Sequence, residues 1–95
     1  MKKIYVSGPM TGLPENNFPA FHAATAMLRE RGHTVFNPAE VGEIPGMTWE
    51  FYMRKDIKML CEADAIYLLP GWEKSKGAHL ELHIAHRIGM DVMFA

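Results

Sequence analysis

The chain has 95 residues, of which 48% are hydrophobic and 22% charged, with a formal net charge of −1 and one cysteine. This length and composition indicate one globular domain over residues 1–95, and they exclude a disordered chain, a basic nucleic-acid-binding surface and an internal disulfide. Because no apolar stretch approaches the roughly 20 residues of a membrane span or makes a signal peptide, we expect a soluble cytoplasmic protein without membrane contacts.

The first third of the chain predicts a strand, a loop, a helix and a second strand. The β-branched and aromatic run 4–6 predicts a buried strand, and the loop 7–17 after it is rich in glycine, proline and asparagine. A helix is expected to begin near Phe18, where the proline that follows suits an opening turn, and to end before Gly32. Residues 34–36 then predict a short strand.

The rest of the chain predicts a loop, two helices and two more strands. Residues 37–47 show no period and form a loop, and Thr48 can cap a helix with a buried stripe. The apolar run 65–69 is typical of a strand covered on both faces, while residues 77–88 predict a helix and 91–94 a last strand. The stripe of the capped helix consists of Trp49, Met53, Ile57 and Leu60.

Strands and helices that alternate in this way predict a parallel sheet. We expect an α/β fold, a doubly wound sheet of about four strands with helices on both faces, like flavodoxin and Rossmann folds. Ligands of such sheets bind at the carboxyl ends of the strands, near the point where the strand order reverses. Of the three segments that follow strand ends, those that begin at Ser7 and Pro70 are the richest in glycine and polar residues.

The segment after the first strand contains groups that suit a phosphate. Its backbone N–H groups and the hydroxyls of Ser7 and Thr11 are suitable phosphate ligands. The glycine spacing matches neither a dinucleotide fingerprint nor a Walker loop, so a plain strand-to-helix turn stands as the alternative. The candidate binding residues of this segment are Ser7, Gly8, Pro9, Met10, Thr11 and Gly12.

Two acidic residues lie on the apolar faces of predicted helices. Asp56 falls on the stripe of the second helix, where a carboxylate is costly unless it is hydrogen-bonded or used. Glu81 projects toward the sheet, one turn into a helix whose N-terminus favours the ionised form that a nucleophile needs. Gly77, four residues earlier, would let a substrate approach the backbone. The alternatives are an aspartate that bonds a nearby loop and a glutamate that stabilises a helix start. The apolar neighbours of Glu81 on its face are Ile84, Ala85 and Ile88.

Three histidines on the third helix raise the question of a metal site. His79 and His83 stand at i and i+4 with His86 on the same side, a spacing that can hold zinc. The metalloprotease pattern, however, needs a glutamate directly after the first histidine, where this chain has Leu80. Because Glu81 points the other way, we expect no metal and no other cofactor, and we interpret the histidines as a solvated or subunit-contact face.

Taken together, these residues resemble the pattern of a known family. The chain is similar to the nucleoside 2-deoxyribosyltransferase superfamily, which includes deoxynucleoside 5′-monophosphate N-glycosidases, and most of all to its short phage and prophage members. The similarity runs nearly end to end, and its most specific part is the strand 63–69 followed by Gly77-x-x-x-Glu81-x-x-x-Ala85. It implies that the chain cleaves the N-glycosidic bond of a nucleotide or nucleoside.

The resemblance also assigns three catalytic roles. Glu81 matches the nucleophile, which attacks the anomeric carbon and forms a glycosyl-enzyme. Tyr5 matches the tyrosine whose hydroxyl positions that glutamate, and Asp56 matches the aspartate that contacts the substrate and assists departure of the base. The physical chemistry agrees, because such cleavage uses one ionised carboxylate and one proton donor, and partial burial would raise the pKa of Asp56 toward that of a donor.

Ser75 indicates which substrate the site prefers. In the family, transferases of free nucleosides carry an aspartate six residues before the nucleophile, whereas hydrolases of nucleotides carry a serine there. A carboxylate would repel a 5′-phosphate, and a hydroxyl beside Lys74 and Lys76 would accept one. We therefore expect Ser75 and Gly77 to contact a nucleoside monophosphate.

The chain departs from the family at its end. It stops at Ala95, before the C-terminal segment that relatives send into the neighbouring subunit's site, and the resemblance implies at least a homodimer. Two other interpretations stay open: a non-catalytic nucleotide-binding module that kept the pocket, and a structural phage protein that neither binds nor cleaves nucleotides. The base, the sugar and the acceptor, water or a second base, are not determined by the sequence.

Overall fold

The computed structural model describes residues 1–95 and contains one four-stranded sheet in which every pair of neighbouring strands is parallel. The strands lie in the order β2-β1-β3-β4. This confirms the predicted α/β fold, and each strand lies within one residue of its predicted bounds. The strands are β1 (Lys3–Ser7), β2 (Thr34–Phe36), β3 (Ala65–Leu68) and β4 (Asp91–Phe94).

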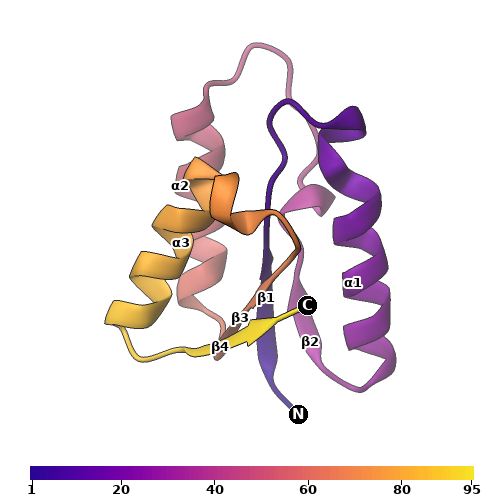
Figure 1. Ribbon diagram of the computed structural model, residues 1–95, viewed down its shortest axis with the longest axis vertical. Coiled ribbons are helices and arrows are strands. Elements are labelled where there is room, and N and C mark those ends of the chain that lie inside the picture. The colour runs from indigo at the N-terminus through magenta and orange to yellow at the C-terminus, as the bar shows by residue number, and fades with distance from the viewer.

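Three α-helices cover the two faces of this sheet. Helix α1 (Phe18–Glu30) lies on one face, and α2 (Trp49–Cys61) and α3 (Lys76–Arg87) lie side by side on the other (Figure 1). None of them is long and apolar enough to cross a bilayer. Short 3₁₀ turns precede α1, follow β2 and precede α3, at Pro14–Asn17 (η1), Pro38–Glu40 (η2) and Trp72–Lys74 (η3).

Side-chain caps fix where α2 and α3 begin. The Thr48 hydroxyl accepts a hydrogen bond from the backbone N–H of Phe51, which confirms the predicted cap of α2. Ser75 caps α3 in the same way by accepting from Ala78, so this helix begins one residue before the predicted Gly77. At its other end α3 stops at Arg87, and Ile88, predicted on the buried face, is instead 56% exposed.

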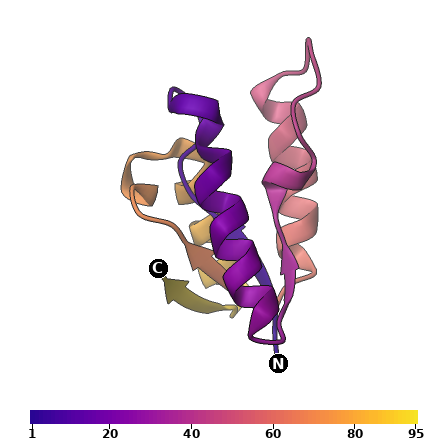
Figure 2. The ribbon, with the colours of Figure 1, turned by 90° about the vertical axis from the view of Figure 1, so that its right-hand side faces the viewer.

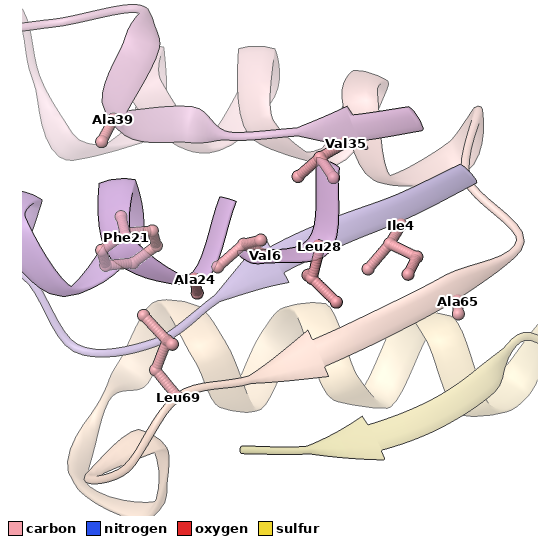
Figure 3. Packing of buried hydrophobic residues seen from close by; sticks show 9 residues of the cluster. All are labelled: Ile4, Val6, Phe21, Ala24, Leu28, Val35, Ala39, Ala65 and Leu69. Carbon is pink, nitrogen blue, oxygen red and sulfur yellow. The ribbon is translucent and has the colours of Figure 1, made fainter. Parts of the chain in front are cut away.

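The alternation of side chains along β1 divides the core in two. Ile4 and Val6 point to the α1 face, where they pack against Leu28 in a cluster of nine buried residues (Figure 3). Tyr5 and Ser7 point to the opposite face, covered by α2 and α3, and both are fully buried. Strand β1 therefore sends two hydroxyl groups toward α3. The core on that side consists of Tyr5, Leu60, Ile66, Leu68 and Ala85.

Gly8, directly after β1, lies too close to Leu69 for any other side chain. A Cβ at position 8 would lie 2.8 Å from the Cβ of Leu69, which is itself buried. We expect Gly8→Ala to lower the free energy of unfolding by about 1–3 kcal/mol, because two backbone segments must separate to admit the methyl group. Urea denaturation measures this. The matched change Gly12→Asn adds a Cβ that meets no atom within 4 Å, in a left-handed conformation that asparagine tolerates, so an equal loss there would contradict the account.

Candidate functional site

The strand order places a cavity at the carboxyl ends of the strands. From β1 the chain first crosses to β2 on one side and later reaches β3 on the other, so the order reverses around β1. Ligands of such sheets bind at this reversal, and a cavity of about 560 Å³ lies there. It is lined by the segments after β1, β2 and β3 and by the N-terminal parts of α1, α2 and α3. Figures 1 and 2 show the segments after β1 and β2 at the same end of the molecule.

The buried carboxylate of Glu81 is held by two hydroxyl groups. The Tyr5 hydroxyl donates to its Oε2 and the Ser7 hydroxyl to its Oε1, each at 2.6 Å. Both donors come from the same face of β1, and Glu81 comes from the second turn of α3, so the contact joins strand and helix across the core. A carboxylate that accepts two short hydrogen bonds is fixed in position, and Glu81 lines the cavity.

Burial controls the charge of Glu81. Desolvation raises its pKa from 4.5 to about 7, although the hydrogen bonds from Ser7 and Tyr5 lower it and the negative charge of Asp56 raises it further. Burial thus outweighs the effect of the helix N-terminus, which was expected to favour the ionised form of Glu81. Glu81 is the sixth residue of α3, beyond the first turn in which the helix dipole acts, and only 4% of it is exposed.

The two ionisable groups near Glu81, Tyr5 and Asp56, differ in whether they lose their proton near neutral pH. Burial raises the pKa of Tyr5 well above 10, so its phenol stays protonated and donates. Burial also raises the pKa of Asp56 from 3.8 to about 6, which confirms the raised value expected from its place on the apolar stripe. Asp56 lines the same cavity from α2. The site therefore presents two carboxyl groups that titrate near neutrality and one phenol that does not.

Removing a hydroxyl from this cluster should move the pKa of Glu81 upward. In Ser7→Ala the carboxylate loses one charge-assisted hydrogen bond, which stabilises its ionised form, so we expect its pKa to rise by about one unit or more. A carbon-13 NMR titration of the Glu81 carboxyl group measures this. Thr25→Ala is the matched control, because it removes a buried hydroxyl that bonds only the carbonyl of Phe21. A pKa of Glu81 that stays the same or falls in Ser7→Ala would contradict the geometry.

The structure brings most of the predicted site residues into one cavity. Tyr5, Asp56 and Glu81 line it together, and so do Ser75 and Gly77 from the start of α3. Of the predicted segment after β1, Gly8, Pro9, Met10 and Thr11 line the cavity. Ser7 and Gly12 do not. The Ser7 hydroxyl, predicted as a phosphate ligand, is instead buried against Glu81.

Gly77 lies where α2 and α3 approach each other. A Cβ at this position would lie 3.2 Å from the sulfur of Met53. The absence of a side chain at Gly77 therefore leaves room for Met53, and it also leaves the backbone open to the cavity. The prediction that a substrate approaches Gly77 remains a prediction.

Several cavity residues carry no signal in the sequence. The loop after β2, predicted as irregular and given no role, contributes Pro38, Gly42 and Glu43. The side chain of Asn16 donates to the Glu43 carboxylate and so connects the segments after β1 and β2 at the cavity. Trp49 and Tyr52 add an aromatic wall, and the spacing of Trp49 to Asp56, two helical turns, was the one available clue.

His79, the first of the three histidines of α3, takes part in other contacts. The Nε2 of His79 lies 2.6 Å from the carbonyl oxygen of Glu73, and its ring packs against Trp72. No group of three or more histidine, cysteine, aspartate and glutamate side chains is arranged to hold a metal ion.

Comparison with known proteins places the chain in a family. The family described as "Domain of unknown function (DUF4406)" matches residues 2–94. A search of the curated proteins finds no match. A solved 2-deoxyribosyltransferase from the psychrotolerant bacterium Bacillus psychrosaccharolyticus is similar with a TM-score of 0.75 and 27% identity, over 97% of this chain and 70% of that one. A 2-deoxyribosyltransferase from Leishmania mexicana is similar with a TM-score of 0.75 and 22% identity, over 99% of this chain and 63% of that one, a likeness that shows the fold alone. The chain thus spans about two thirds of these enzymes and has their fold, and it belongs to the DUF4406 family.

Proposed function

We propose that this protein cleaves the N-glycosidic bond of a nucleoside 5′-monophosphate through a covalent bond between the sugar and Glu81. The observation that carries the proposal is the position of Glu81, held by the hydroxyls of Tyr5 and Ser7 at 2.6 Å each in a cavity that Asp56 also lines. A fixed carboxylate beside a second, protonatable carboxyl group is the arrangement that cleavage with a covalent intermediate requires. The likeness to a 2-deoxyribosyltransferase at 27% identity supports the same chemistry.

In the first step one oxygen of ionised Glu81 attacks the anomeric carbon of the sugar. The bond between that carbon and the base nitrogen breaks, and its electron pair leaves with the base. Asp56, whose pKa of about 6 leaves a fraction protonated near neutrality, donates the proton that the base needs. The hydroxyl group, of Tyr5 or Ser7, that donates to the other oxygen of Glu81 keeps the carboxylate oriented. Water, or a second base, then attacks the same carbon and frees Glu81, with Asp56 taking up the proton.

Basic groups at the start of α3 support a phosphate on the substrate. Lys74, Ser75 and Lys76 all line the cavity. Within the chain, no hydrogen bond uses the backbone N–H groups of Lys76 and Gly77, which are free to donate at the N-terminus of the helix. Glu43, the acidic residue of the cavity rim, follows β2, whereas Lys74, Ser75 and Lys76 follow β3. The strand order therefore puts the acidic residue and the basic group on opposite sides of β1.

Ser75 is expected to set the preference between nucleotide and nucleoside. In Ser75→Asp the new carboxylate still caps α3 but repels a 5′-phosphate, so the ratio of kcat/KM for a nucleoside monophosphate to that for its nucleoside should fall by about tenfold or more. Ser75→Thr keeps both cap and hydroxyl and is the matched control. An unchanged ratio in Ser75→Asp would remove the argument for the phosphate.

Base release from a panel of nucleoside and deoxynucleoside monophosphates tests the proposed function. Wild-type protein should release free base from at least one of them, and Glu81→Gln should release none. Binding by calorimetry without base release would instead identify a non-catalytic nucleotide-binding module. Neither binding nor release would indicate a structural protein.

Assembly as a homodimer is part of the proposal. Three large apolar side chains remain exposed on α3, directly after it and on β4: Leu80, Ile88 and Phe94. Such residues are suited to a contact between subunits. Light scattering should give twice the mass of one chain, and a monomer at the concentrations that support base release would contradict this part of the proposal.

A further inference from the structure

Lys76 and Trp49 form a contact at the rim of the cavity that the proposed reaction does not use. The ammonium of Lys76 lies over the indole ring of Trp49, 4.2 Å from its centroid. Trp49 is the first residue of α2 and Lys76 the first residue of α3, and both line the cavity. The contact therefore joins the N-termini of the two helices that carry Asp56 and Glu81.

Lys76 has no stronger partner within the chain. The salt bridges of the protein join Lys2 to Asp91 and Arg29 to Glu40, and neither involves Lys76. The side chain of Lys76 is exposed, and at an exposed site a contact between an ammonium and a ring is weaker than a charge-assisted hydrogen bond to a phosphate. An anion that enters this end of the cavity will therefore compete successfully with the ring for Lys76.

We infer that Lys76 and Trp49 form a phosphate-sensitive latch, in which a 5′-phosphate draws Lys76 off the indole ring and so selects nucleotides over nucleosides. This rests on the proposed function for its substrate, and it adds a specificity-determining residue and a movement. In the structure the ammonium of Lys76 covers one face of Trp49. When a phosphate binds to the free backbone N–H groups at the start of α3, the ammonium of Lys76 moves to the phosphate, and the indole face is uncovered. A nucleoside leaves the contact intact.

Steady-state kinetics of Lys76→Met test the selection. Methionine keeps an apolar stem against Trp49 and removes the charge. We expect kcat/KM for a nucleoside monophosphate to fall about tenfold, through KM, so that its ratio to kcat/KM for the nucleoside falls by a similar factor. Lys58→Met, which removes an exposed charge from α2 outside the cavity, should change nothing. An unchanged KM for the nucleotide in Lys76→Met would overturn the inference. So would a fall in kcat/KM for the nucleotide that occurs in Lys74→Met and not in Lys76→Met.

Tryptophan fluorescence tests the movement without any turnover. The chain has two tryptophans, so Trp72→Phe leaves Trp49 as the only reporter. Inorganic phosphate, titrated at constant ionic strength against chloride, should change the emission of Trp49 in this variant and leave it unchanged when Lys76→Met is added. The same response to chloride, or a response that survives Lys76→Met, would refute the latch. Because this readout needs no base release, a response that depends on Lys76 in a protein without activity would refute the proposed function and keep the latch.

Discussion

Replacing Glu81 with glutamine is expected to abolish base release and, at alkaline pH, to stabilise the fold. The loss of activity should exceed about a thousandfold, because an amide cannot form the glycosyl bond. The gain in stability follows from burial, which raises the pKa of Glu81 from 4.5 to about 7. The folded protein thus binds this proton more tightly than the unfolded chain does, and the free energy of unfolding falls as the pH rises between these two values.

The size of the effect follows from the same shift. A difference of 7 − 4.5 = 2.5 between the folded and ordinary pKa of Glu81 corresponds to about 3 kcal/mol, which the wild type loses above pH 7 and the glutamine variant keeps. Urea denaturation at about pH 4 and about pH 8 should therefore show a gain of that order at the higher pH and little at the lower. Glu30→Gln, at an exposed position, is the control and should show no such dependence. A glutamine variant that is active would show that Glu81 is not the nucleophile. A glutamine variant that is less stable than wild type at about pH 8 would show that Glu81 is not a buried charge.

Replacing Asp56 with asparagine is expected to change both the rate and the shape of the pH profile. The productive state has Glu81 ionised and Asp56 protonated. Burial raises the pKa of Glu81 to about 7 and that of Asp56 to about 6, so this state is a minority at every pH. The profile of kcat/KM against pH should be a narrow bell with its maximum between these two values. Because the two charges interact, the apparent pKa of each limb describes the pair of carboxyl groups and not one of them alone. Asp56→Asn removes the proton donor, so kcat should fall by about 10²–10⁴ and the alkaline limb should disappear.

The control for this prediction is an exposed aspartate. Asp91 pairs with Lys2 at the surface, and Asp91→Asn should keep the bell and its height. If Asp56→Asn keeps both limbs, the donor is a different group. If its activity increases steadily with pH through about 7 and then stays level, the remaining limb reports Glu81 alone, as the account requires.

The parts of this structure that the sequence predicted are those set by local rules. Thr48 was recognised as a cap because the residue type and its place before an apolar stripe suffice. The strand at residues 4–6 was recognised from its β-branched and aromatic residues. Asp56 was predicted as a candidate site residue because a carboxylate on an apolar stripe is costly unless it is hydrogen-bonded or used.

The parts that were missed depend on contacts distant in the sequence. Ser7 was interpreted as a phosphate ligand, yet its hydroxyl bonds Glu81, 74 residues away. The alternation of β1, which puts Tyr5 and Ser7 on one face, contained that signal. The charge of Glu81 was predicted from the helix dipole, a local effect, and burial by the whole fold outweighed it. The loop after β2 has no periodicity, so only the folded chain reveals that Glu43 borders the cavity.

Mass spectrometry of the quenched protein tests most directly whether Glu81 forms a bond to the sugar. Wild-type protein is mixed with a deoxynucleoside monophosphate that it cleaves, acid-quenched at successive times and digested. The account predicts one added sugar-phosphate unit on the peptide that contains Glu81, present during turnover and absent from Glu81→Gln. Steady release of base with no adduct on that peptide at any quench time, or with the adduct on another side chain, would contradict it.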